Sequence, residues 1–153
     1  MNPHESAFAE SFISKARRER VLELLASSKN RYKFTSKLDH HGRDYFIPEC
    51  ILSIEPQHQH PPNIADILRA TGAPETCHVI GGGHDGKNME LLTALKQIVG
   101  YGTGTVLSCI PGKLAYFEAR FENGSCSFGR KGNLRVRWRR QSPGAHRSDP
   151  DGR

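Results

Sequence analysis

The fold is decided by one stretch of the chain, Thr105-Val106-Leu107-Ser108-Cys109-Ile110-Pro111-Gly112-Lys113-Leu114-Ala115-Tyr116-Phe117-Glu118-Ala119. Its first six residues are rich in β-forming side chains, and Pro111-Gly112 is a turn pair. Residues 114–119 are a second run of the same kind. Two such runs joined by a short turn predict a β-hairpin. The other segments are therefore interpreted as elements built around a sheet.

The segments before this hairpin alternate between helical and β-like patterns. Apolar residues at helical spacing predict helices over residues 2–26, 63–71 and 89–99, with a short one at 32–38. In the first of these, Asn2 is the expected cap, Pro3 suits the first turn, and Glu5 completes a capping box. Strands are predicted at 50–54, 76–80 and 125–128, the first at a sheet edge because Pro48 precedes it.

These elements predict one α+β domain over residues 4–128. We expect a single sheet of about four to five strands with about three helices packed on it, including the C-terminal hairpin. Residues 129–153 are expected to form a basic, disordered tail. A chain of 153 residues has room for one compact core and hardly two.

The compartment is inferred from two further features. No apolar run approaches the ~18 residues that a membrane-spanning helix needs, and residues 1–5 lack the features of a secretory signal. The four cysteines, Cys50, Cys77, Cys109 and Cys126, form no Cys-x-x-Cys pair. We therefore expect a soluble cytoplasmic protein with reduced thiols, two disulfides being the alternative.

The positive charge is concentrated at the C-terminus. The net charge is +6, and residues 128–153 carry eight basic against two acidic side chains, so they account for the whole excess. Guanidinium groups there could bind phosphate while an indole stacks on a base. The alternatives are an incidental extension and a basic edge strand. The candidate nucleic-acid-binding residues are Arg130, Lys131, Arg135, Arg137, Trp138, Arg139 and Arg140.

A smaller cationic cluster lies at residues 15–20 of the predicted first helix. Glu19 lies within this cluster, and Glu23 follows one turn later. Mixed charges at helical spacing are typical of a solvated helix face, and that is the interpretation favoured here.

A glycine-rich segment, Gly81-Gly82-Gly83-His84-Asp85-Gly86-Lys87-Asn88, lies between a predicted strand and a predicted helix. Its spacing resembles the phosphate-binding loop G-x-x-x-x-G-K-[ST] of nucleotide-hydrolysing proteins, and also the fingerprint G-x-G-x-x-G. The resemblance implies phosphate bound by backbone N–H groups and Lys87. Asn88 replaces the hydroxyl residue that holds Mg²⁺, and Asp85 puts a carboxylate where phosphate would bind. A flexible loop is the favoured alternative.

A second glycine-rich segment covers residues 100–104. It follows a predicted helix and so is explained most simply as a helix end that leads into a strand. Two such loops side by side would frame a small-ligand crevice. The candidate ligand-binding residues are Gly81, Gly83, Gly86, Lys87, Gly102 and Gly104.

Histidines and cysteines do not form a recognisable catalytic or metal-binding pattern. The pairs His40-His41 and His58/His60 have neither helical metal-ligand spacing nor an accompanying carboxylate pattern typical of a metal site. Cys77 and His78 are adjacent, but neighbours on a strand point to opposite faces and cannot form a dyad. No metal or cofactor is predicted.

These observations favour a non-catalytic protein-binding or regulatory module, with no membrane association and with another protein as the expected partner. One alternative is a nucleic-acid-associated protein that binds through its Arg-rich tail. The other is an enzyme that binds a nucleotide or phosphate ligand through residues 81–87.

Overall fold

The structure is a computed structural model that describes residues 1–118 and, for the backbone alone, 126–129. The described part contains a six-stranded sheet in the order β1-β6-β5-β4-β2-β3, in which all neighbouring strands are antiparallel. The helices are α1 (Pro3–Phe12), α2 (Lys15–Ala26), α3 (Tyr32–Tyr45), α4 (Pro61–Ala70) and α5 (Leu91–Ile98). The strands are β1 (Ile51–Ser53), β2 (Thr76–Ile80), β3 (Asn88–Glu90), β4 (Thr105–Ile110), β5 (Leu114–Glu118) and β6 (Cys126–Gly129).

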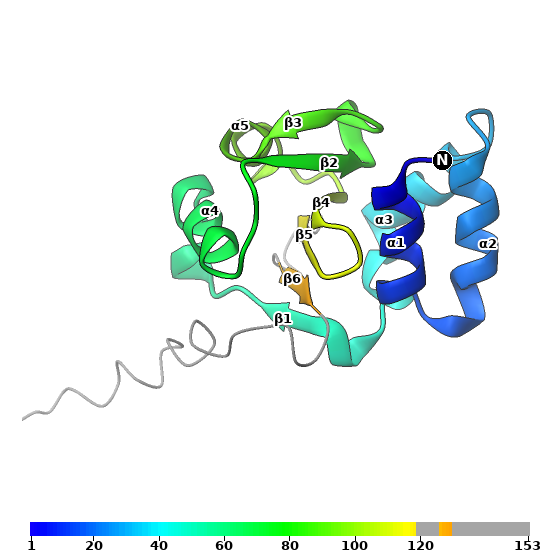
Figure 1. Cartoon of the computed structure of the whole chain (residues 1–153), viewed down its shortest axis with the longest axis horizontal. Coiled ribbons are helices and arrows are strands. Elements are labelled where there is room, and N and C mark those ends of the chain that lie inside the picture. Colours follow the sequence, from blue (N-terminus) through cyan, green and yellow to red (C-terminus); the bar gives the residue numbers. More distant parts are fainter. Residues whose placement is uncertain (119–125, 130–153) are drawn as a thin grey trace, which may run out of the picture.

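The helices cover both faces of the sheet. Figure 1 shows α4 and α5 on one side and α1, α2 and α3 on the other, with α2 outermost. Successive side chains of a strand point to opposite faces, so each central strand contributes to both cores. On β5, Ala115 and Phe117 join the α1–α3 core, whereas Leu114 and Tyr116 join the α4–α5 core. This double coverage explains why β4 and β5 are nearly continuously apolar in sequence.

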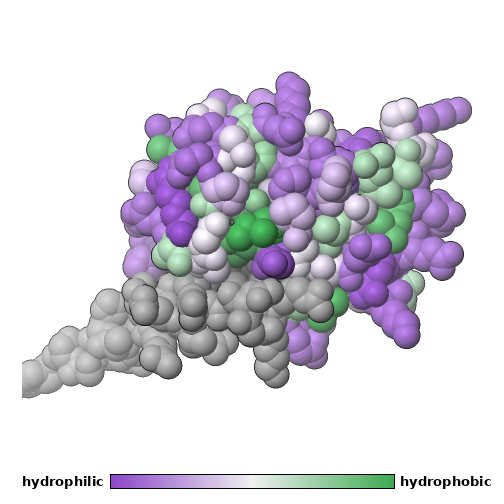
Figure 2. Space-filling view, viewed as in Figure 1, coloured by the Kyte–Doolittle hydropathy of each residue, from purple (hydrophilic) through white to green (hydrophobic). Residues whose placement is uncertain are grey.

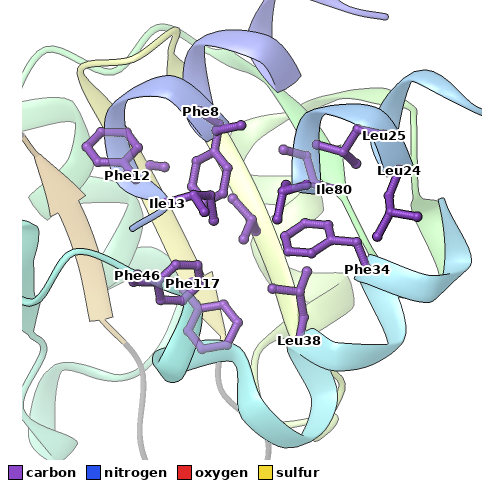
Figure 3. Close-up of a cluster of buried hydrophobic side chains, with 14 residues drawn as sticks. Phe8, Phe12, Ile13, Leu24, Leu25, Phe34, Leu38, Phe46, Ile80 and Phe117 are labelled. Carbon is purple, nitrogen blue, oxygen red and sulfur yellow. The ribbon is translucent and has the colours of Figure 1, made fainter. Parts of the chain in front are cut away.

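Aromatic rings fill much of the core between the sheet and the α1–α3 layer (Figure 3). Phe46 packs edge-on against Phe117 of β5, with ring centroids 5.1 Å apart, and against Phe8 of α1 at 6.1 Å. All three side chains are at most 2% exposed. Burying one such ring contributes about 1.5–3 kcal/mol, so this cluster is a main attachment of the helical layer to the sheet.

The predicted fold class is confirmed, because the described part is a mixed α+β structure with helices packed on one antiparallel sheet. The hairpin of β4 and β5 lies at the predicted residues, and β2 has the predicted bounds. Strand β1 is an edge strand, as Pro48 indicated. No helix among residues 1–118 is long and apolar enough to cross a membrane.

Three local predictions are wrong. The helix predicted over residues 2–26 is two helices, because the chain turns at Ile13, which forms a β-bridge with Phe46. The short helix predicted at 32–38 extends to Tyr45, with non-helical backbone at His41. The predicted loop 81–88 ends in strand β3, which pairs with β2, so the helix predicted over residues 89–99 begins only at Leu91. In each case the bounds of the element depend on a contact with a distant segment or on a break in the backbone, neither of which local periodicity shows.

Candidate functional site

A buried ionic network joins the α1–α3 layer to the sheet. At its centre, the carboxylate of Glu5 on α1 is only 2% exposed. It accepts hydrogen bonds from Arg31 at 2.9 and 3.3 Å and lies 2.9 Å from Nε2 of His78 on β2. The same guanidinium donates to Asp85 at 2.8 and 2.9 Å. The planar fork of Arg31, just before α3, therefore bridges a carboxylate of α1 and one of the loop after β2.

The charges of this network support one another. Burial disfavours ionised Glu5, but the hydrogen bonds from His78 and Arg31 outweigh it and lower the pKa of Glu5 to about 2. Burial likewise lowers the pKa of His78, but its bonds to Glu5 and Asn88 outweigh this, and the net shift is upward. Hydrogen bonds to Asp85 and then Glu5 raise the pKa of Arg31. Arg31 is therefore ion-paired with Glu5 and Asp85, and the raised pKa of His78 favours its charged form beside Glu5.

A second imidazole stacks on His78. The rings of His4 and His78 are 5.7 Å apart and nearly parallel, and His4 Nδ1 lies 2.8 Å from Ser108 Oγ. Burial and then electrostatic repulsion from His78 lower the pKa of His4, which favours the neutral form of this ring. The serine and the carboxylate thus contact different imidazoles, and Ser108 is 1% exposed. This arrangement differs from a catalytic triad, in which one imidazole contacts both groups.

Carboxylates of the chain itself bind both glycine-rich segments, which we call the first glycine loop (residues 81–87) and the second glycine loop (residues 100–104). Asp85 accepts a hydrogen bond from the N–H of Gly81 at 2.7 Å. In the second glycine loop, Gly104 donates to Asp39 of α3 at 2.7 Å and Gly100 donates to Glu118 of β5 at 3.1 Å. Three N–H groups of the kind that would cradle an anion therefore already bind internal carboxylates.

The two glycine loops lie side by side, which is the arrangement that the predicted crevice requires. A Cβ on Gly81 would lie 3.1 Å from the carbonyl oxygen of Gly104. A Cβ on Gly104 would lie only 2.1 Å from the carbonyl oxygen of Leu38, so that loop is pressed against α3. These two glycines are required by close backbone approach. Ligand binding by either loop stays a prediction.

The remaining predicted ligand-binding residues face open surroundings. A Cβ on Gly83, Gly86 or Gly102 would meet nothing within 4 Å, and Lys87 is exposed. The first glycine loop leads into β3, and α5 begins only at Leu91. No helix N-terminus therefore follows this loop directly, unlike the phosphate-binding loop that it resembles.

The second glycine loop displays an aromatic side chain. Tyr101 is 71% exposed, the highest value among the large hydrophobic residues of the described part. It lies between Gly100 and Gly102, whose φ angles of +87° and +72° favour glycine. With Glu118 and Asp39 bound at the two ends of the loop, the tyrosine is held on a short, anchored turn.

The predicted thiol and histidine arrangements are also located by the structure. Cys77 packs in the α4–α5 core while His78 faces Glu5, so the two side chains point to opposite faces, as predicted. Burial raises the pKa of Cys77 to about 12 and also raises that of Cys109. Among residues 1–118, no group of three or more His, Cys, Asp and Glu side chains is arranged to hold a metal ion.

The sequence interpretation missed Glu5, Arg31, Asp39 and Glu118 as organising residues. Only Glu5 has a local signal, because it shares the apolar face of α1 with Phe8 and Phe12. That face predicts burial, and a buried carboxylate requires a partner. Asn2 does cap α1, because its side-chain Oδ1 accepts a hydrogen bond from the N–H of His4 at 2.7 Å. Glu5, however, binds Arg31 and His78 instead of completing the capping box.

The predicted nucleic-acid-binding residues, Arg130 to Arg140, lie outside the described residues. Comparison of the chain with protein-family models, with curated proteins and with solved structures gives no significant match in any of the three.

Proposed function

We propose that the protein is a non-catalytic protein-binding module whose partner contacts the second glycine loop. The observation that carries the proposal is Tyr101, 71% exposed on a turn anchored at both ends. Tyrosine is enriched at protein interfaces because it offers a large contact area with few rotatable bonds. Loops held by a rigid scaffold are common sites of recognition.

The internal pairing of charges supports a binding role. The carboxylate of Glu5 is hydrogen-bonded to Arg31 and His78, and Arg31 is also hydrogen-bonded to Asp85. A general base needs a pKa near the working pH, whereas the pKa of Glu5 is about 2. A thiol nucleophile needs a lowered pKa, whereas burial raises that of Cys77 to about 12. The network is suited to holding the first glycine loop through Asp85, while Asp39 of α3 and Glu118 hold the second.

The proposal is tested with a photo-crosslinking amino acid at position 101 in the full chain, exposed to an extract of the native cell. The matched control places it at Lys113, an exposed position in the β4–β5 turn. We expect a specific partner from position 101 and none from position 113. With the purified partner, Tyr101→Ala should weaken binding by roughly 30-fold, the effect of a hot-spot residue, and Lys113→Ala should have little effect.

The same partner captured from both positions, or unchanged affinity of Tyr101→Ala, would contradict the proposal.

The nucleotide alternative has its own readout. ATP or GTP would raise the melting temperature by mass action, and Lys87→Ala would abolish the rise.

A further inference from the structure

The α2–α3 helical hairpin carries a charge excess that the neutral total of residues 1–127 conceals. Residues 15–45 contain nine basic and four acidic side chains, whereas the rest of residues 1–127 contains five basic and ten acidic ones. A hairpin of charge +5 is thus joined to a remainder of charge −5. The charge is therefore distributed unevenly over the chain, and the basic hairpin belongs to the helices on one side of the sheet, with α2 outermost (Figure 1).

The excess is greatest around the start of α3. No acidic residue occurs between Glu23 and Asp39, while four basic ones do. One of these, Arg31, is bound by Glu5 and Asp85. The other three are Lys29, Lys33 and Lys37, all exposed and, among the described residues, without a carboxylate within 4 Å. We call these three lysines and Tyr32 the α3 basic surface.

The spacing of these residues suits a phosphate chain. Side chains four residues apart on a helix lie on one face with Cβ atoms about 5–6 Å apart, as holds for Lys33 and Lys37 of α3. Lys29 lies in the turn that leads into this helix. On the side where α2 lies, the visible surface carries hydrophilic residues along its margin and hydrophobic ones between them (Figure 2). A row of unpaired cations is the electrostatic footprint expected for a polyanion.

An exposed aromatic ring lies next to these lysines in the sequence, at the first residue of α3. Tyr32 is 61% exposed and is the immediate neighbour of Lys33. An acidic protein would need only the lysines, but an aromatic side chain among cations is the combination that binds unpaired bases by stacking. Duplex nucleic acid, whose bases are already stacked, would make little use of it. We propose that the α3 basic surface binds single-stranded nucleic acid, with lysines on phosphates and Tyr32 on a base.

This surface does not include the second glycine loop, so the two proposals fail independently. The experiment measures fluorescence anisotropy of a labelled single-stranded oligonucleotide and of the matching duplex, with the full chain, at several salt concentrations. The variants are Lys33→Ala/Lys37→Ala, Tyr32→Ala and Tyr32→Phe. The control Lys96→Ala/Lys113→Ala removes the same charge from exposed lysines of α5 and the β4–β5 turn, so any general attraction by the remaining cations is equal in both double variants. Circular dichroism verifies folding.

We expect Lys33→Ala/Lys37→Ala to reduce the slope of log affinity against log salt by about 1.4, since each single-strand phosphate contact contributes about 0.7. Tyr32→Ala should weaken single-strand binding roughly 5- to 150-fold, and Tyr32→Phe should restore it. The proposal would be overturned if the two double lysine variants lost the same amount of affinity, or if Tyr32→Ala bound the single strand as tightly as the wild type. A preference for duplex that does not depend on Tyr32 would overturn it as well. Tyr101→Ala should bind the oligonucleotide normally.

Discussion

Glu5→Gln should lower the free energy of unfolding far more than the same substitution at an exposed glutamate would. The substitution keeps the shape of the side chain and removes the charge that Arg31 and His78 bind. A pKa lowered from 4.5 to about 2 means that the site favours the ionised over the neutral carboxyl by about 3 kcal/mol. Gln resembles the neutral form, so the free energy of unfolding should fall by about 3 kcal/mol at pH 7. In the variant Arg31 still pairs with Asp85, so no further loss of stability is expected from an unpaired guanidinium.

The pH dependence gives the reasoning a second, sharper readout. Glu5 has a lowered pKa, so its contribution is complete above pH 4.5 and is lost as the pH falls toward about 2. The stabilities of the wild type and Glu5→Gln should therefore converge in acid. His78 has a raised pKa, so its contribution is complete below its ordinary 6.5 and is lost as the pH rises through the raised value. Glu5→Gln should weaken this alkaline loss as well.

The assay is urea unfolding followed by far-UV circular dichroism from pH 2 to pH 9, with the slope m checked for constancy. The control is Glu23→Gln, which removes the same charge from an exposed pair with Arg20 at 3.9 Å and should change stability by less than about 0.5 kcal/mol. If Glu5→Gln matches this control at pH 7, or if its deficit persists unchanged at pH 2, the buried network does not have the electrostatic role derived above.

Three other predictions test the glycine loops and the cores. Gly104→Ala should prevent folding or lower the free energy of unfolding by more than about 3 kcal/mol in a thermal unfolding assay, because its Cβ would lie 2.1 Å from a backbone oxygen of α3. The control Gly83→Ala places a Cβ that meets nothing within 4 Å, so it should be tolerated. In the native protein, alkylation followed by mass spectrometry should modify Cys50, which is partly exposed, well before the buried Cys77 and Cys109. Asp85→Ala should speed amide hydrogen exchange in the first glycine loop about 10-fold or more, because Gly81 loses its acceptor.

The elements that the sequence predicts correctly are those whose signal is local. The hairpin of β4 and β5 has β-forming residues on both arms and its turn residues between them, so no distant contact is needed to define it. The periodicity of α5 is likewise strong over its whole length, and Gly100 follows its end. Such segments favour the same conformation in isolation and in the fold.

The features that the sequence does not predict depend on distant partners. Residues 2–26 have a continuous helical pattern, yet Ser14 N donates to Tyr45 O and Ile47 N to Phe12 O, which divides the pattern into two helices. Arg31 is separated from Glu5 by 26 residues and from Asp85 by 54. No spacing rule connects positions so far apart, so the candidate site emerges only when the sheet has brought α1, α3 and β2 together.

Asp85 gives the resemblance of the first glycine loop to a phosphate-binding loop a structural explanation. Such a loop needs an anion, because glycines leave N–H groups that point at one site. Here the anion is supplied by the loop itself: Asp85 accepts from Gly81 and is held there by Arg31. Binding an external phosphate at Gly81 would require this carboxylate to leave both partners, at the cost of charge-assisted bonds worth about 1.5–3 kcal/mol each. A carboxylate within a glycine-rich loop is therefore a sequence feature that favours an internally closed loop over a nucleotide site.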